Sequence, residues 1–165
     1  MDTHRSPEVA AVSEKLRAET TVPRLLGESA RSFAQLFGSP ACTISRVIGD
    51  LLVDLIQHKD EGRTDRLGHG YLISDYPLTR AVVEERRPRT VFAGDSDADR
   101  AEAELLAELG FDSLLMVAIE SDDRVWGLVE VYGDNGRRFT DDDVALASEL
   151  ASEVSGLLSR LERPA

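Results

Sequence analysis

Seven side chains between residues 69 and 126 are of the types that line binding sites for small molecules. Arg80 is the most specific of them, because its planar guanidinium group can hold a carboxylate or a phosphate through two parallel hydrogen bonds. The competing interpretation is a surface ion pair with Glu84, four residues further along a predicted helix. Phe92 and Trp126 would supply apolar walls. The candidate ligand-binding residues are His69, Tyr71, Asp75, Tyr76, Arg80, Phe92 and Trp126.

Residue types that carry covalent catalysis and metal binding are sparse. Cys42 is the single cysteine, which excludes an internal disulfide and a multi-cysteine zinc site. Its place at the start of a predicted strand favours a buried thiol. The three histidines lie far apart in the sequence and do not suggest a metal triad. No nucleophile has a base at a recognisable spacing, and no glycine-rich phosphate loop precedes a helix. We therefore expect a non-enzyme without catalytic residues or a metal site.

The composition argues against several classes of partner. The chain has 165 residues and a formal net charge of −12, which suits one domain and would repel nucleic acid and anionic membranes. No apolar run reaches the length of a membrane-spanning helix, and the N-terminus lacks the basic and then apolar order of an export signal. These features predict a cytoplasmic protein that binds neither nucleic acid nor membrane.

The elements that must position the candidate residues are helices and short strands in alternation. Capping residues, prolines and glycines delimit the helices, and β-rich apolar runs mark the strands. Tight connections at 49–50 and 121–124 require antiparallel neighbours, while a charged, glycine-rich stretch over 59–70 indicates an exposed loop. The pattern predicts helices over 7–20, 23–38, 77–87, 96–110 and 141–162, and strands over 41–48, 51–58, 89–93, 114–119 and 125–132, with a further short strand near 71. This is an α+β domain with a mostly antiparallel sheet.

The hairpin formed by 114–119 and 125–132 lacks the polar face of a half-solvated sheet. Both faces of its first strand are apolar, and one face of its second strand is wholly aliphatic. An apolar centre on both sides implies a covering layer on each side. We assign the aliphatic face to the long terminal helices and the mixed face, with Trp126, Glu130 and Tyr132, to residues 60–112. Short helices and loops pack less tightly than a long helix, so a pocket is expected in this second layer.

At this point the sequence resembles a GAF domain, the small α+β sensor module of signalling proteins. The resemblance spans roughly residues 24–160. It is most specific in "FDSLLMVAIESDDRVWGLVEVYGDNGRRFTDDDVALASELASEVSGLL", with its acidic turn, its apolar residues around Gly127, its "RFT" step and the acids that open the last helix. "YPLTRAVVEERRPRTVFAGD" resembles the preceding family segment. The resemblance implies a six-stranded antiparallel sheet with the terminal helices on one face, a ligand pocket under short helices and loops on the other, and a dimer built from the terminal helices.

The cofactors and the enzymatic activity known in the family fit the residues of this chain poorly, so the cofactor stays unknown. Members that bind bilin covalently use a cysteine in the pocket layer, and Cys42 is far from that segment, so no covalent bilin is expected. Haem would need an axial ligand, for which His69 is a candidate. A lone histidine in a glycine-rich loop is more often simply solvated, so haem is disfavoured. The lysine-containing motif of cyclic-nucleotide-binding members is missing, which disfavours a cyclic nucleotide, but this ligand stays an alternative because related pockets bind nucleotides without the motif. Reduction of free methionine sulfoxide requires several cysteines, which makes this enzymatic alternative the third choice.

The last predicted helix carries more apolar surface than one contact requires. Two stripes recur along it, formed by Val144, Ala147, Ala151, Val154, Leu158 and Leu161 and by Leu146, Leu150 and Leu157. A second stripe indicates a second contact surface. We therefore predict a homodimer through the N- and C-terminal helices, with residues 1–22 as a dimerisation or linker helix and 23–162 as the sensor domain. The predicted function is a small-molecule sensor that signals to a downstream effector. The alternative is a ligand-free dimerisation module of a larger signalling protein.

Overall fold

The computed structural model describes residues 6–60 and 69–163, so residues 61–68 of the predicted loop lie outside the described residues. The element order follows the sequence prediction closely. The helices are α1 (Pro7–Arg17), α2 (Val22–Leu36), α3 (Pro77–Glu85), α4 (Arg100–Leu109) and α5 (Asp141–Glu162), with a short 3₁₀ helix η1 (Ile73–Asp75). The strands are β1 (Ala41–Ile48), β2 (Leu51–Lys59), β3 (Gly70–Leu72), β4 (Arg89–Phe92), β5 (Ser113–Ser121) and β6 (Arg124–Gly133).

Local capping explains where the helices begin and end. At α5, the Thr140 hydroxyl accepts a hydrogen bond from the Asp143 amide, and the Asp143 carboxylate accepts one from the Thr140 amide. This capping box satisfies two backbone donors, and the acids of the first turn complement the helix dipole. Gly110 ends α4 in the left-handed conformation, with φ of 81°. The acidic run at the start of α5 therefore has a structural role.

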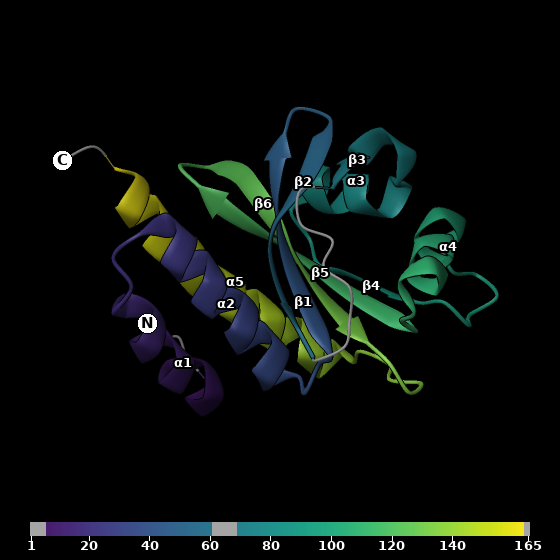
Figure 1. The fold of residues 1–165 in the computed structure, drawn as a ribbon, viewed down its shortest axis with the longest axis horizontal. Helices are drawn as coiled ribbons and strands as arrows, with labels where there is room; N and C mark the ends of the chain where they lie inside the picture. The colour runs from purple at the N-terminus through teal and green to yellow at the C-terminus, as the bar shows by residue number, and fades with distance from the viewer. Residues whose placement is uncertain (1–5, 61–68, 164–165) are drawn as a thin grey trace.

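The six strands form one antiparallel sheet in the order β3-β2-β1-β6-β5-β4. Helices α1, α2 and α5 lie on one face, which we call the floor side, whereas α3 and α4 lie on the other, which we call the roof side (Figure 1). The α+β prediction, with terminal helices on one face and short helices on the other, is confirmed. The central strands β6 and β5 are buried from both sides, as their apolar faces require.

Helix α1 joins the floor-side core and does not stand apart from the domain. Its Val9 and Leu16 are fully buried against α2 and α5. The same core encloses Leu150 and Leu157, which belong to the second apolar stripe of α5. This stripe is thus buried within one chain, and it no longer argues by itself for a partner subunit.

A β-bulge changes the face on which Trp126 lies. The β5–β6 register shifts between Ile119 and Glu120, which leaves Trp126 as an extra residue on β6. Its indole packs in the floor-side core, its Nε1 donates to Glu162 Oε2 of α5 at 3.2 Å, and the Arg46 guanidinium lies 4.3 Å from its ring centre. The prediction that Trp126 shares the mixed face with Glu130 and Tyr132 is therefore wrong, because strict alternation ends at the bulge.

Gly127 marks the closest approach of β6 to β1, and its replacement is expected to disturb the sheet centre. A Cβ atom at this position would lie 2.1 Å from the carbonyl oxygen of Ser45, and backbone cannot yield as a flexible side chain does. Gly127→Ala should lower the free energy of unfolding by about 2 to 4 kcal/mol in urea denaturation.

The matched control is Gly27→Ala in the interior of α2, where no atom lies within 4 Å of the added Cβ. That change should leave stability unaltered or raise it by up to about 1 kcal/mol. Equal effects of the two substitutions would contradict the role given to Gly127.

Candidate functional site

A small cavity lies between the sheet and the roof-side elements. Its volume is about 20 Å³, which is room for about one water molecule. Strands β2 and β6 form its base, and β3, η1, α3 and α4 close it from above. The lining residues are Leu52, Asp54, Tyr71, Ile73, Tyr76, Thr79, Glu102, Leu105, Glu130 and Tyr132.

Three acidic side chains from different elements meet at this cavity. Asp54 comes from β2, Glu102 from α4 and Glu130 from β6, and all three are buried. Among the cavity-lining residues of the described chain, none carries a positive charge. A cavity with this lining suits groups that donate hydrogen bonds or carry positive charge.

Hydroxyl groups hold these carboxyl groups in place. The Ser45 hydroxyl donates to Asp54 Oδ1 at 2.7 Å, and the Tyr132 hydroxyl donates to Glu130 Oε2 at 2.9 Å. The Thr79 hydroxyl donates to Glu102 Oε1 and so connects α3 with α4. Each of these hydroxyls is a neutral partner, so the hydrogen bonds orient the carboxyl groups without neutralising a negative charge.

The strand pairing explains why these groups converge. A register shift between β1 and β2 after Ile44 brings Asp54 opposite Ser45. On β6, Glu130 and Tyr132 lie two residues apart and share the roof-side face. The Tyr132 ring stacks on Phe111 with centres 4.7 Å apart, which fixes its hydroxyl beside Glu130.

Burial changes the proton affinity of this group of residues. The pKa of Glu130 is raised to about 8, chiefly by desolvation and then by the nearby charges of Asp54 and Glu102, while hydrogen bonds from Tyr132 and Ser45 oppose this rise. Burial also raises the pKa of Glu102 and raises that of Tyr132 well above its usual value. Glu130 is thus largely protonated at neutral pH, where it offers both a donor and an acceptor.

The structure brings two of the predicted site residues to the cavity. Tyr71 of β3 and Tyr76, which precedes α3, both line it, with ring centres 6.0 Å apart in an edge-to-face arrangement. Both rings are half-buried. The aromatic side chains that line the cavity are therefore Tyr71, Tyr76 and Tyr132, and not Phe92 and Trp126 as predicted.

The other predicted residues lie away from the cavity. His69 and Asp75 are exposed, and Arg80 points to solvent, where its Nε lies 2.8 Å from Glu84 Oε1. The surface ion pair is therefore the arrangement observed for Arg80. Phe92 and Trp126 do not line the cavity either. Phe92 packs against the Arg138 guanidinium, whose central carbon lies 3.9 Å from the ring centre, and Trp126 belongs to the floor-side core.

Sequence reasoning missed Asp54, Thr79 and Glu102 and did not single out Glu130 as a site residue. Glu130 had a usable signal, because it is the sole charged residue within an otherwise apolar stretch of β6. Glu102 had none, because α4 carries several acids and only tertiary packing distinguishes the buried one.

Other features bear on the cofactor predictions. Cys42 is fully buried in the floor-side core, and burial raises the pKa of its thiol. It therefore contributes nothing to the roof-side cavity. Within residues 6–60 and 69–163, no group of three or more His, Cys, Asp or Glu side chains is arranged to hold a metal ion. No helix in the same ranges has the length and apolar character needed to span a membrane.

Comparison with known families identifies this architecture. A family model of the GAF domain matches residues 22–158. The chain belongs to the GAF family. GAF domains are small-molecule sensor modules. A search of curated proteins found no match. The GAF match covers α2 to α5, and α1 precedes it.

Solved structures of phytochromes share the fold of this GAF domain. The phycoerythrobilin-bound GAF domain of a cyanobacterial phytochrome has a TM-score of 0.81 and 14% identity, with 93% of this chain and 96% of that chain covered. A phycocyanobilin-bound GAF domain of a cyanobacterial phytochrome has a TM-score of 0.79 and 16% identity, and the match covers 98% of this chain and 97% of that chain. The bacteriophytochrome RpBphP3 of R. palustris has a TM-score of 0.82 and 15% identity. The match covers 94% of this chain but only 37% of that longer chain.

Glu130 is expected to make stability depend on pH. Its pKa of about 8 in the folded chain exceeds the value of about 4.3 in an unfolded chain. The folded state therefore holds a proton that the unfolded state releases, and stability should fall as pH rises from about 5 to 8, by at most about 1.4 kcal/mol per pH unit from this group. Glu130→Gln should flatten this slope and make the protein more stable than the wild type above pH 8.

Urea denaturation at pH 6, 7, 8 and 9 measures the difference between the two proteins. Glu104→Gln is the matched control, because Glu104 lies on the exposed side of α4 and pairs with Arg100. The control should retain the wild-type slope. An unchanged slope in Glu130→Gln would mean that Glu130 is ionised throughout this range.

Proposed function

We propose that this GAF domain is a non-enzymatic sensor that binds a small organic cation, or a ring rich in hydrogen-bond donors, in the roof-side cavity. The supporting observation is the buried pair Glu102 and Glu130, for which the structure shows hydrogen bonds from the hydroxyl groups of Thr79, Ser45 and Tyr132 and from the Thr79 backbone. Buried carboxylates gain most from a charged or donating partner. An amine, guanidine or aminopurine would supply this partner, and Tyr71 and Tyr76 would flank its flat body.

The same lining disfavours anions. A phosphate or carboxylate in this cavity would lie beside the buried acidic side chains Glu102 and Glu130. Arg80 is the residue that sequence reasoning favoured for an anionic ligand, and it is held outside the cavity by Glu84. The proposed ligand therefore has the opposite charge to the one that Arg80 would select.

Ligand entry requires the roof side to move. A cavity of about 20 Å³ is far smaller than the roughly 300 Å³ of typical small-molecule pockets. The sheet is fixed on its floor side by three helices, whereas α3 and α4 are short. We propose that these two helices and β3 shift outward when a ligand binds.

Two features of the known neighbours are not carried over. The cyanobacterial domains are bilin-bound, but Cys42 lies across the sheet from the cavity, so we propose no covalently attached bilin. Haem through His69 is not proposed either, since that residue is exposed. Methionine sulfoxide reduction is not proposed, because it requires several cysteines and the chain has only Cys42.

The small cavity volume also favours a second candidate function. A closed roof side fits a ligand-free module that serves only to join subunits within a larger signalling protein. In both candidates the output would run through α5 to an effector. Self-association through α1 and α5 stays a prediction. Leu150 and Leu157 of the second stripe of α5, which suggested it, are buried in the floor-side core of a single chain, and Leu146 is partly buried there.

Thermal unfolding with two matched ligand panels tests the proposed function. One panel contains guanidines, protonated amines and aminopurines, and the other contains carboxylic acids and cyclic nucleotides. A ligand at 100 times its Kd adds about 2.7 kcal/mol, which corresponds to a rise in Tm of about 5 to 10 °C for a domain of this size. We expect this rise with members of the first panel only.

The pH dependence of binding identifies the site. A guanidine stays charged between pH 6 and 9, and it would displace the proton of Glu130, so its stabilising effect should grow with pH in the wild type. Glu130→Gln should remove this growth, whereas Glu104→Gln should retain it. If neither panel raises Tm and mass spectrometry of freshly purified protein finds no bound molecule, the ligand-free alternative is favoured.

A further inference from the structure

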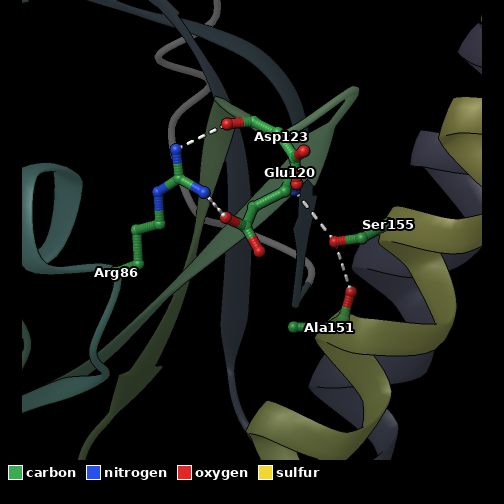
Figure 2. Close-up of polar contacts among 5 residues, drawn as sticks. All are labelled: Arg86, Glu120, Asp123, Ala151 and Ser155. Atoms are coloured by element: carbon green, nitrogen blue, oxygen red, sulfur yellow. Dashed lines mark hydrogen bonds and ion pairs between the residues drawn. The ribbon is translucent and has the colours of Figure 1, made fainter.

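A chain of polar contacts joins the roof side to the floor side at one end of the sheet (Figure 2). Arg86 follows the last residue of α3, and its guanidinium contacts Glu120 Oε1 at 2.7 Å and the Asp123 carbonyl oxygen at 2.5 Å. The Glu120 amide donates to Ser155 Oγ of α5 at 2.9 Å, and the Ser155 hydroxyl donates to the Ala151 carbonyl at 2.7 Å. Helices on opposite faces of the sheet are thus connected through β5.

Arg86 has a backbone conformation that needs an explanation. It ends α3 in the left-handed region with φ of 57°, which an arginine adopts at a cost that glycine would avoid. Its ion pair with Glu120 is partly exposed, with side-chain exposures of 46% and 40%, and such pairs contribute little to stability. The benefit of arginine at this position is therefore the direction of its side chain, which reaches the β5–β6 turn.

Glu120 is placed to respond to both sides. It lies where the β5–β6 register shifts, next to the bulge formed by Trp126. Its side chain binds the roof-side Arg86, while its backbone amide binds the floor-side Ser155. A bulge bends its strand and redirects nearby side chains, so this part of the hairpin differs from the regular ladder on either side.

Helix α3 connects this contact chain with the cavity. Its first half carries Thr79, which lines the cavity and binds Glu102, and Tyr76, which also lines the cavity, directly precedes the helix. The helix has nine residues and is about 13 Å long, so it moves as a rigid piece. A shift of its N-terminal end at the cavity therefore displaces Arg86 at its other end.

We propose that Arg86, Glu120 and Ser155 form a mechanical connection through which the position of α3 controls the packing of α5 on β5. The role of a ligand in moving α3 rests on the proposed function. The connection itself belongs to the ligand-free protein, so it can be tested without a ligand, and its failure is distinguishable from failure of ligand binding. Coupling is reciprocal, which means that a change on either side must be felt on the other.

Amide hydrogen exchange of the ligand-free protein, followed by NMR, supplies one reporter on each side. The Glu120 amide reports the bond to Ser155, and the Arg86 amide, which donates to the Val82 carbonyl at 2.9 Å, reports the end of α3. Arg86→Ala should speed exchange of the Glu120 amide by about fivefold, and Ser155→Ala should speed exchange of the Arg86 amide by about threefold. Glu120→Gln, which retains the backbone bond but removes the charge, should affect both reporters.

Two variants on the same helices are matched controls. Arg80→Ala removes an exposed ion pair of α3 that does not reach the hairpin, and Ser152→Ala removes an exposed hydroxyl of α5. Neither should alter the distant reporter. The proposal is overturned if Arg86→Ala leaves the Glu120 amide unchanged, if Ser155→Ala leaves the Arg86 amide unchanged, or if the controls produce the same effects. Retained global stability in urea shows that the changes are local.

Discussion

Burial of both faces of β5 and β6 is the constraint on which the rest of this structure depends. Leu115, Val117 and Ile119 face the floor side, while Leu114 and Met116 face the roof side. Exposure of one such side chain costs about 1.5 to 3 kcal/mol, so the sheet is stable only when both covering layers are in place. The floor side meets this need with a 22-residue helix backed by two others, and the roof side does so with short pieces. The two layers therefore differ in construction.

The difference in chemistry between the layers follows from this difference in construction. Long helices fill the floor side with aliphatic contacts. The roof side instead encloses carboxyl and hydroxyl groups that must satisfy one another, with Glu130 in the middle of a strand and Thr79 and Glu102 on separate helices. Buried polar groups are stable only when they are paired. Movement of a roof-side helix would break such pairs, and a ligand that replaced the lost hydrogen bonds would offset the loss. This supports the proposed ligand site on the roof side of the sheet.

The sequence allowed the layers to be predicted better than the site. Periodicity and caps identified the elements, their order and the face covered by the terminal helices, because these depend on local pattern. Trp126 was misplaced because one extra residue at a bulge reverses the alternation, and no local signal marks that bulge. Asp54 and Glu102 were missed because their burial depends on the register of β1 with β2 and on the docking of α4. Arg80 drew attention by its type, although packing leaves it at the surface.

The displaced Trp126 has a practical consequence. It is the only tryptophan in the chain, and its indole is held between the Arg46 guanidinium and Glu162, the last residue of α5. Indole emission depends on nearby charges and on solvent access. When the excitation is selective for tryptophan and avoids the three tyrosines, the fluorescence of the unmodified protein originates from a single locus. That locus is the junction between the hairpin and the C-terminal end of α5. Trp126 is therefore a built-in optical probe of how the C-terminal end of α5 packs against the hairpin.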